Sequence, residues 1–261
     1  MKKIGLAFFL LFFLVFGFGE RANAQPSHEI MISAAFSLKN AFEEIGKVFQ
    51  EKYPKVKAVF NFGASGDLAR QIEAGAPVDV YASAAQKDMD DLIIKGIIVV
   101  DSKVDFLSNT VVLLKPANSK LKLRSLKDLL RAEVKKIVIG NPKTVPAGRY
   151  AEESLKHFGL WEPLKNKLIF AENVRQALDY LARGEVDAGF VFSTDAQVRS
   201  KEVEIITTLS ESSHQPIIYP IGIIKGTKEG TWSKKFIDFV MSKESQAILT
   251  RYGFRAVHSG R

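Results

Sequence analysis

Residues 62–79 read FGASGDLARQIEAGAPVD and combine two structural signals. The apolar residues that end at Phe62 are typical of a strand, whereas Leu68 and Ile72 follow helical spacing. A turn of small residues that contains Ser65 separates the two signals. The sequence therefore predicts a strand, a turn and the N-terminus of a helix, where free backbone N–H groups and the helix dipole favour an anion.

The same order of strand, small turn and helix start recurs three more times along the chain. Ordinary helix capping explains any one of these junctions taken alone, because serine and asparagine are common caps. Their repetition favours a shared role. The further junctions centre on Ser37, on Ala147 and Gly148 after Pro146, and on Asn173 with Gln176, a pair spaced as in a capping box.

Strands and helices alternate throughout, which predicts an α/β fold with mainly parallel sheets. A short helix is expected around Leu126, and one long final helix from Thr231 to about Tyr252. No Pro/Gly/Ser-rich linker divides the chain, so two lobes joined by more than one crossover fit better than two consecutive domains. The crossings are expected near residues 105–112 and 215–225.

The N-terminus has the pattern of a secretory signal. Lys2 and Lys3 precede an apolar run, and Ala-Asn-Ala stands directly before Gln25. We therefore expect residues 1–24 to be a cleaved signal peptide and the mature protein to be periplasmic. A membrane anchor is the alternative, because the apolar run is near the lower limit for spanning a bilayer.

Charge and cysteine content exclude several classes of protein. The net charge is +8, and loss of residues 1–24 removes three cations and one anion, which leaves +6 on 237 residues. This excess favours encounter with anions, but the lysines are scattered and form no basic block of the kind that binds nucleic acid. The absence of cysteine excludes disulfides, zinc-thiolate sites and cysteine nucleophiles.

Four short motifs lie at these junctions and near the C-terminus: Ala-x-Ser-Leu at Ser37, the run from Leu68 to Pro77 after Ser65, Val-Pro-Ala-Gly at Ala147, and Arg-Tyr-Gly-Phe ending at Phe254. Together they resemble the periplasmic molybdate-binding proteins, the substrate-binding components of molybdate ABC transporters. The resemblance covers almost the whole mature chain. It implies a type II periplasmic-binding-protein fold, in which two α/β lobes are joined by two crossover strands with a ligand cleft between them. Lobe I is then expected at residues 25–108 and 222–261, and lobe II at 109–221.

The resemblance also implies which residues bind the oxyanion. Ser37 and Ser65 each correspond to a hydroxyl and a backbone N–H, whereas Ala147 and Val174 correspond to backbone N–H groups. The fifth position of the family is a tyrosine, and this chain has Phe192 there. A phenolic donor is therefore missing, and Phe192 is expected as a wall of the site. The resemblance implies no catalytic residue, no cofactor and no direct protein ligand to the metal of the bound oxyanion.

The expected ligand is molybdate, or tungstate, which is nearly the same size. Two junctions in each lobe would let the ligand clamp the lobes together, and the closed form would signal to a membrane permease. The resemblance thus implies a monomeric receptor that binds an oxyanion and an ABC-transporter permease, with no nucleic-acid partner. A type II binding protein for another tetrahedral oxyanion such as sulfate is the alternative, since selectivity depends on cavity radius.

A secreted serine hydrolase is less consistent with the sequence. A nucleophile elbow requires glycine two places after the serine, and Asp67 stands there after Ser65. The four histidines show no ligand spacing. Arg70 is expected to be a solvated or structural charge, whereas Arg149 fits either a charge close to the site or an exposed side chain.

Overall fold

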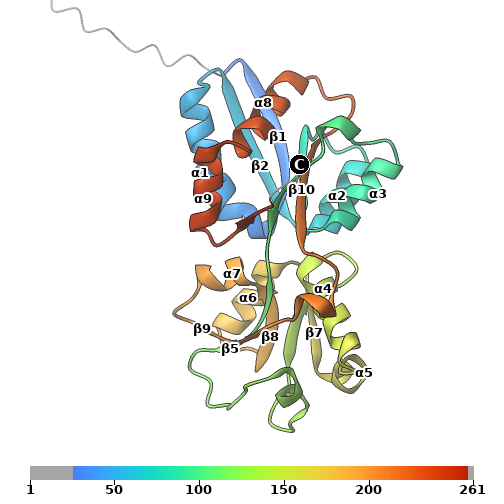
Figure 1. The fold of residues 1–261 in the computed structure, drawn as a ribbon, viewed down its shortest axis with the longest axis vertical. Coiled ribbons are helices and arrows are strands. Elements are labelled where there is room, and N and C mark those ends of the chain that lie inside the picture. The colour runs from blue at the N-terminus through green and yellow to red at the C-terminus, as the bar shows by residue number, and fades with distance from the viewer. Residues whose placement is uncertain (1–25, 258–261) are drawn as a thin grey trace, which may run out of the picture.

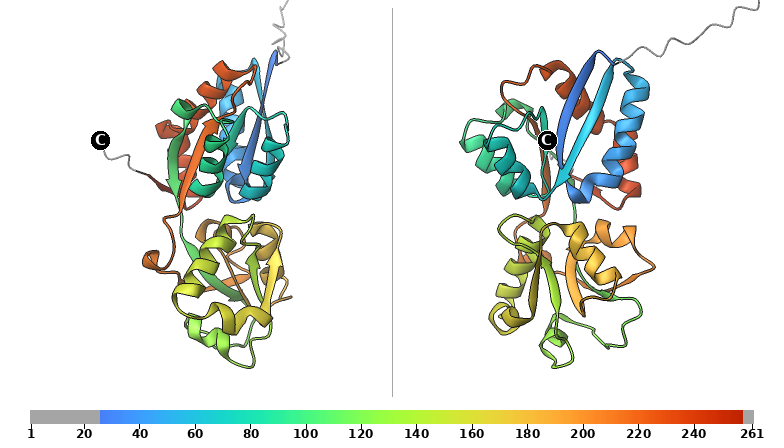
Figure 2. Two further views of the ribbon diagram at one scale, coloured as in Figure 1. Left: turned by 90° about the vertical axis from the view of Figure 1, so that its right-hand side faces the viewer. Right: turned by 180° about the vertical axis from the view of Figure 1, so that it is seen from behind.

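The computed structural model describes residues 26–257 as two lobes, one above the other in Figure 1, and Figure 2 shows both from two further sides. The predicted signal peptide, residues 1–24, lies outside the described residues. Each lobe is built around one β-sheet, with helices on both faces.

The first lobe holds a six-stranded sheet. Parallel pairs join β1 to β2 and to β3, whereas β10 and β4 run antiparallel to their neighbours. The spatial order is β11 (Arg255–Ala256), β4 (Val104–Ser108), β10 (Ile218–Ile223), β3 (Val80–Ala82), β1 (His28–Ala35) and β2 (Val56–Gly63). Its helices are η1 (Phe36–Leu38), α1 (Lys39–Lys52), α2 (Ser65–Glu73), α3 (Gln86–Ile94), η2 (Val100–Ser102), α8 (Gly230–Val240) and α9 (Lys243–Arg251).

Helices α1, α8 and α9 contact one another, and α2 contacts α3 on the other side of this sheet (Figure 1). Buried aromatic side chains fill the layer under α1 and α8: the ring of Phe236 lies 5.3 Å from Phe49 and 6.1 Å from Phe42, edge to face in both pairs. A separate apolar layer that includes Leu68, Ile72 and Met89 lies under α2 and α3. The core of this lobe therefore holds the helix that begins at Ser65 firmly against the sheet.

The second lobe holds a five-stranded sheet. Strand β6 pairs in parallel with β7 and β8, and β5 runs antiparallel to β8 and β9. The spatial order is β7 (Leu168–Ala171), β6 (Ile137–Gly140), β8 (Ala188–Phe192), β5 (Val111–Pro116) and β9 (Val203–Thr208). Its helices are η3 (Leu126–Leu130), α4 (Pro146–His157), α5 (Trp161–Leu164), η4 (Lys165–Lys167), α6 (Val174–Ala182), α7 (Ser193–Val198) and η5 (Glu211–Ser213).

The chain passes between the two sheets twice in the described residues. Residues 109–110 join β4 to β5, and residues 209–217 join β9 to β10 (Figure 1). Strand β10 already belongs to the first sheet at Ile218, a few residues before the boundary at 222 expected from the sequence. The strand forms within the apolar run from 217 to 224 and pairs along its length with β3 and β4.

Two expectations need correction. The sheets are mixed rather than mainly parallel, because strands that cross from the other lobe, such as β5 and β10, enter their sheet from the opposite end. The expected single final helix is two helices, α8 and α9. Ser242 lies between them, and its hydroxyl accepts a hydrogen bond from the backbone N–H of Ser245, so it caps a new helix.

Candidate functional site

A small cavity lies where the two lobes meet, at the junctions that the sequence singled out. It is lined by Ala35, Phe36, Ser37, Gly63, Ala64, Ser65, Ala84, Val145, Pro146, Val174 and Phe192. Four of the five expected site residues are among them. The fifth, Ala147, is fully buried and follows Val145 and Pro146 in the chain. A larger open groove on the first lobe, around Asp79 and Lys225, lies away from these junctions.

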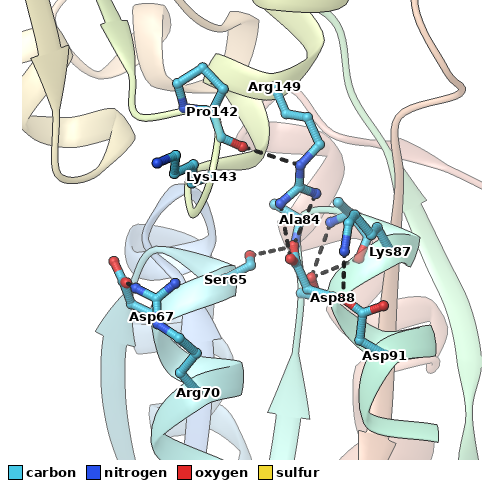
Figure 3. Close-up of polar contacts among 12 residues, drawn as sticks. Ser65, Asp67, Arg70, Ala84, Lys87, Asp88, Asp91, Pro142, Lys143 and Arg149 are labelled. Atoms are coloured by element: carbon cyan, nitrogen blue, oxygen red, sulfur yellow. Dashed lines mark hydrogen bonds and ion pairs between the residues drawn. The ribbon is translucent and has the colours of Figure 1, made fainter. Parts of the chain in front are cut away.

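Ser65 is the first residue of α2 and is completely buried. Its hydroxyl oxygen accepts a hydrogen bond from the backbone N–H of Ala84 at 3.0 Å (Figure 3). The phenol of Tyr81 donates to the backbone carbonyl of Ser65 at 2.8 Å. Because a backbone N–H can only donate, the hydroxyl oxygen of Ser65 is held as an acceptor, and its own hydrogen is left to donate.

Ser37 lies within η1, the short turn between β1 and α1. Ordinary capping, which could explain each junction taken alone, does not occur here, because the side chain of Ser37 caps no helix. Its hydroxyl oxygen instead lies 3.0 Å from the phenol oxygen of Tyr219, on β10. Ser37 is 4 % exposed and Tyr219 is fully buried, so this hydrogen bond is shielded from water and correspondingly strong.

The second lobe contributes two helix N-termini. Pro146 opens α4, where a missing N–H costs nothing. A Cβ atom on Gly148 would lie 1.8 Å from the carbonyl oxygen of Gly140, so only glycine lets the first turn of α4 approach the end of β6. This close approach explains the glycine of Val-Pro-Ala-Gly and brings Val145 and Pro146 to the cavity.

Asn173 is the N-cap of α6, as its spacing predicted. Its side-chain oxygen accepts hydrogen bonds from the backbone N–H groups of Arg175 and Gln176 at 3.0 and 2.9 Å. The side chain of Gln176 reaches back to the N–H of Glu172 rather than to that of Asn173. Val174 is therefore the first residue of the helix and lines the cavity, with an N–H that the cap does not use.

Phe192 ends β8 and is 1 % exposed. Its ring centre lies 5.7 Å from that of Tyr219 and 6.4 Å from that of Tyr150. The family resemblance implied that a phenolic donor is missing at Phe192, and the sequence analysis did not identify Tyr219, whose phenol lies beside Ser37. A polar tyrosine inside the apolar run 217–224 was the available signal for it.

The arginines around the cavity are each paired with a carboxylate. Arg149 of α4 donates to Asp88 of α3 at 3.0 and 3.4 Å, which joins the two lobes (Figure 3). Burial raises the pKa of Asp88, and the charge of Arg149 opposes that rise. Arg175 donates to the fully buried Asp195 at 2.5 Å.

Of the two alternatives open for Arg149, the structure therefore shows a largely buried side chain, 15 % exposed. Arg70 by contrast is exposed and pairs with Asp67, one helical turn earlier. The residues that line the cavity carry no charged side chain; they include the hydroxyls of Ser37 and Ser65 and the first residues of α2 and α6, a combination that can accommodate a small anion.

The surroundings of Ser65 and the clusters of titratable side chains can be compared with what hydrolysis and metal ligation require. Within residues 26–257, no three His, Cys, Asp or Glu side chains come together as a metal site would require. The hydroxyl oxygen of Ser65 receives a backbone N–H, whereas His28 pairs with Glu229 and His214 bonds the carbonyl of Gln215. A serine nucleophile needs a base beside it, and no histidine of residues 26–257 hydrogen-bonds to Ser65.

A family model for bacterial extracellular solute-binding proteins matches residues 30–255. The chain belongs to this family. The molybdate-binding protein ModA of Escherichia coli is 38 % identical to this solute-binding protein, covering 87 % of this chain and 88 % of the relative. ModA of Haemophilus influenzae is 34 % identical and covers 98 % of this chain and 100 % of the relative.

A solved structure from Clostridium difficile, the substrate-binding domain of a proposed molybdenum ABC transporter, is 39 % identical with a TM-score of 0.69. It covers 89 % of this solute-binding protein and 100 % of that chain. These similarities confirm the predicted two-lobed α/β fold and the family resemblance. The family is one of solute-binding proteins rather than of enzymes. In the part of the chain that the structure describes, no helix has the length and apolar character needed to cross a bilayer.

Proposed function

We propose that this protein binds molybdate or tungstate outside the cytoplasm and delivers it to the membrane permease of an ABC transporter. One observation carries the proposal. The hydroxyl oxygens of Ser37 and Ser65 both have buried hydrogen-bond partners next to one cavity, and that of Ser65 is held as an acceptor by a backbone N–H. The relatives named molybdate-binding proteins supply the identity of the anion.

A fully deprotonated tetrahedral dianion offers only acceptors. A matching site presents only donors, held in place before binding and shielded from water. The proposed donors are the hydroxyl and backbone N–H groups of Ser37 and Ser65 and the backbone N–H groups of Ala147 and Val174, with Phe192 as a wall. Helix N-termini supply positive potential, so no unpaired arginine is needed.

Binding is proposed to hold the lobes together. Ser37 and Ser65 belong to the first lobe, whereas Ala147 and Val174 lie in the first turns of helices of the second. An anion bonded to all four stabilises the closed arrangement, which the permease then recognises. The protein is proposed to act as a monomer in the periplasm after cleavage before Gln25.

Titration calorimetry of residues 25–261 against molybdate, tungstate, sulfate and phosphate tests the proposal. We expect one site per chain, tight binding of molybdate and tungstate, and much weaker binding of sulfate and phosphate. Ser65→Ala removes a donor and leaves the N–H of Ala84 without its acceptor, and we expect it to weaken molybdate binding at least tenfold. Sulfate binding as tight as molybdate binding would overturn the assignment in favour of a sulfate carrier.

A further inference from the structure

A chain of buried hydrogen bonds leads from the first crossover to Ser37, and it begins at Asn109. This residue lies between β4 and β5 and is 6 % exposed. Its side-chain oxygen accepts hydrogen bonds from the backbone N–H of Thr110 at 2.8 Å and from the hydroxyl of Ser193 at 3.0 Å. Because the N–H of Thr110 can only donate, the amide of Asn109 has one possible orientation, with its nitrogen on the opposite side.

The amide nitrogen of Asn109 makes two hydrogen bonds. It donates to the hydroxyl oxygen of Thr194 at 2.9 Å and to the phenol oxygen of Tyr219 at 3.1 Å. Tyr219 is fully buried, and burial holds the pKa of its phenol well above the usual value, so the phenol keeps its hydrogen. Among residues 26–257, Ser37 is the one remaining hydrogen-bond partner of this phenol, so the phenol satisfies its single hydrogen only by donating it to Ser37.

This order determines what Ser37 offers to the cavity. Its oxygen accepts from Tyr219, so its own hydrogen is free to point into the space that it lines. Ser65 reaches the same state through the backbone N–H of Ala84, within its own lobe. Ser37 differs, because the groups that orient it come from β10, from the crossover at Asn109 and, through Ser193 and Thr194, from the second lobe.

We infer that Tyr219 and Asn109 are positioning residues for anion binding, which make Ser37 a hydrogen-bond donor by fixing the direction of the hydrogen bonds that lead to it. This inference rests on the proposed function. Neither residue lines the cavity, so both act through Ser37. A hydroxyl that is already oriented loses no rotational freedom when the anion arrives, and it cannot turn a lone pair toward the anion.

A double-mutant cycle with calorimetry on residues 25–261 and molybdate tests the inference. Tyr219→Phe keeps the ring and removes the donor to Ser37, and we expect roughly tenfold weaker binding. Ser37→Ala should weaken binding at least as much. In the double variant, adding Tyr219→Phe to Ser37→Ala should cause no further loss of affinity, because the hydroxyl that Tyr219 orients is already absent.

If Tyr219 had only a structural role, the double-mutant cycle would give a different result. If Tyr219→Phe weakened binding by loosening the fold, its effect would be equally large with and without Ser37, and additive losses would overturn the inference. Wild-type affinity in Tyr219→Phe would overturn it as well. Tyr252→Phe is the matched control, because its phenol donates to Glu44 at 3.0 Å on the first lobe, away from the cavity. We expect that variant to bind like the wild type.

If Tyr219→Phe folds poorly, a second variant tests the same hydrogen-bond chain. Asn109→Ala removes the donor that orients the phenol, and its effect on affinity should also vanish in the Ser37→Ala background. Unfolding midpoints of all variants are measured without ligand. If the wild type prefers sulfate, the proposed function fails, whereas the same cycle titrated with sulfate still supports or overturns the role of Tyr219. A wild type that binds none of the four anions overturns both.

Discussion

Asp88 of the first lobe and Arg149 of the second form a largely buried ion pair, with their closest atoms 3.0 Å apart. Their side chains are 5 % and 15 % exposed. Close by, the backbone N–H of Gly66 donates to the carbonyl of Thr144 at 2.9 Å, again from one lobe to the other. These contacts exist only while the lobes are together, so they contribute to the equilibrium between open and closed forms.

We expect Arg149→Gln to weaken molybdate binding about tenfold. The closed form of this variant holds the carboxylate of Asp88 without its cation, whereas an open form lets water reach it, so the closed population falls. Calorimetry measures the affinity, and small-angle scattering without ligand measures the closed fraction. Combining Arg149→Gln with Asp88→Asn should recover part of the loss. Arg199→Gln is the control, because Arg199 pairs with Asp179 inside the second lobe, and an equal loss there would contradict the expectation.

Gly66→Ala should have opposite effects on stability and on binding. A Cβ at this position would lie 2.9 Å from the Cα of Thr144 and 3.0 Å from its carbonyl oxygen, so the lobes could not close fully. Alanine in a helix is otherwise favoured over glycine by about 0.5 to 1 kcal/mol. We expect an unchanged or higher unfolding temperature without ligand, and at least tenfold weaker molybdate binding by calorimetry. Gly230→Ala, where the nearest atom is 3.9 Å away, should leave binding unchanged.

The order of elements was predictable because it depends on local spacing. Apolar periodicity identified the strands and helices around Ser37, Ser65 and Asn173, and the cap at Asn173 forms as expected. The break between α8 and α9 was missed because apolar residues keep helical spacing on both sides of Ser242. Periodicity reports which face is buried and carries little information on a single capping hydroxyl.

The pairings that organise the cavity were not predictable in the same way. Ser37 and Tyr219 are 182 residues apart in the chain, Asn109 and Tyr219 are 110 apart, and Asp88 and Arg149 are 61 apart. No local pattern says which distant side chains meet. The family resemblance pointed to the junctions. It did not indicate that the phenol of Tyr219 lies beside Phe192, which becomes visible only when β8 and β10 are placed relative to each other.

Phe192→Tyr is expected to tighten molybdate binding by up to about 1 kcal/mol, roughly fivefold. The ring lines the cavity, and a hydroxyl on it would add the donor that the family resemblance leads one to expect. Calorimetry against molybdate checks this. Unchanged or weaker affinity would mean that the anion oxygen concerned already has its donor. Phe158→Tyr, which adds a hydroxyl to an exposed ring of the second lobe, is the matched control.

The buried carboxyl of Asp195 is expected to make the free energy of unfolding depend on pH. Asp195 is completely buried beside Arg175, and burial raises the pKa of its carboxyl from 3.8 to about 6. The folded state therefore binds this proton more tightly than the unfolded state. Between about pH 4 and pH 6 the folded protein carries the proton and the unfolded chain does not, so this group lowers the free energy of unfolding as the pH rises through that window.

The comparison with Asp195→Asn isolates this effect, since asparagine keeps the shape and an acceptor for Arg175 but does not titrate. We expect the free energy of unfolding of the wild type to fall by about 2 kcal/mol relative to the variant between pH 4 and pH 7, as measured by urea denaturation. Most of the change should be complete by pH 7, because both states are then ionised. A difference that stays constant with pH, or that grows in favour of the wild type as the pH rises, would mean that Arg175 keeps Asp195 ionised in the folded protein despite its burial.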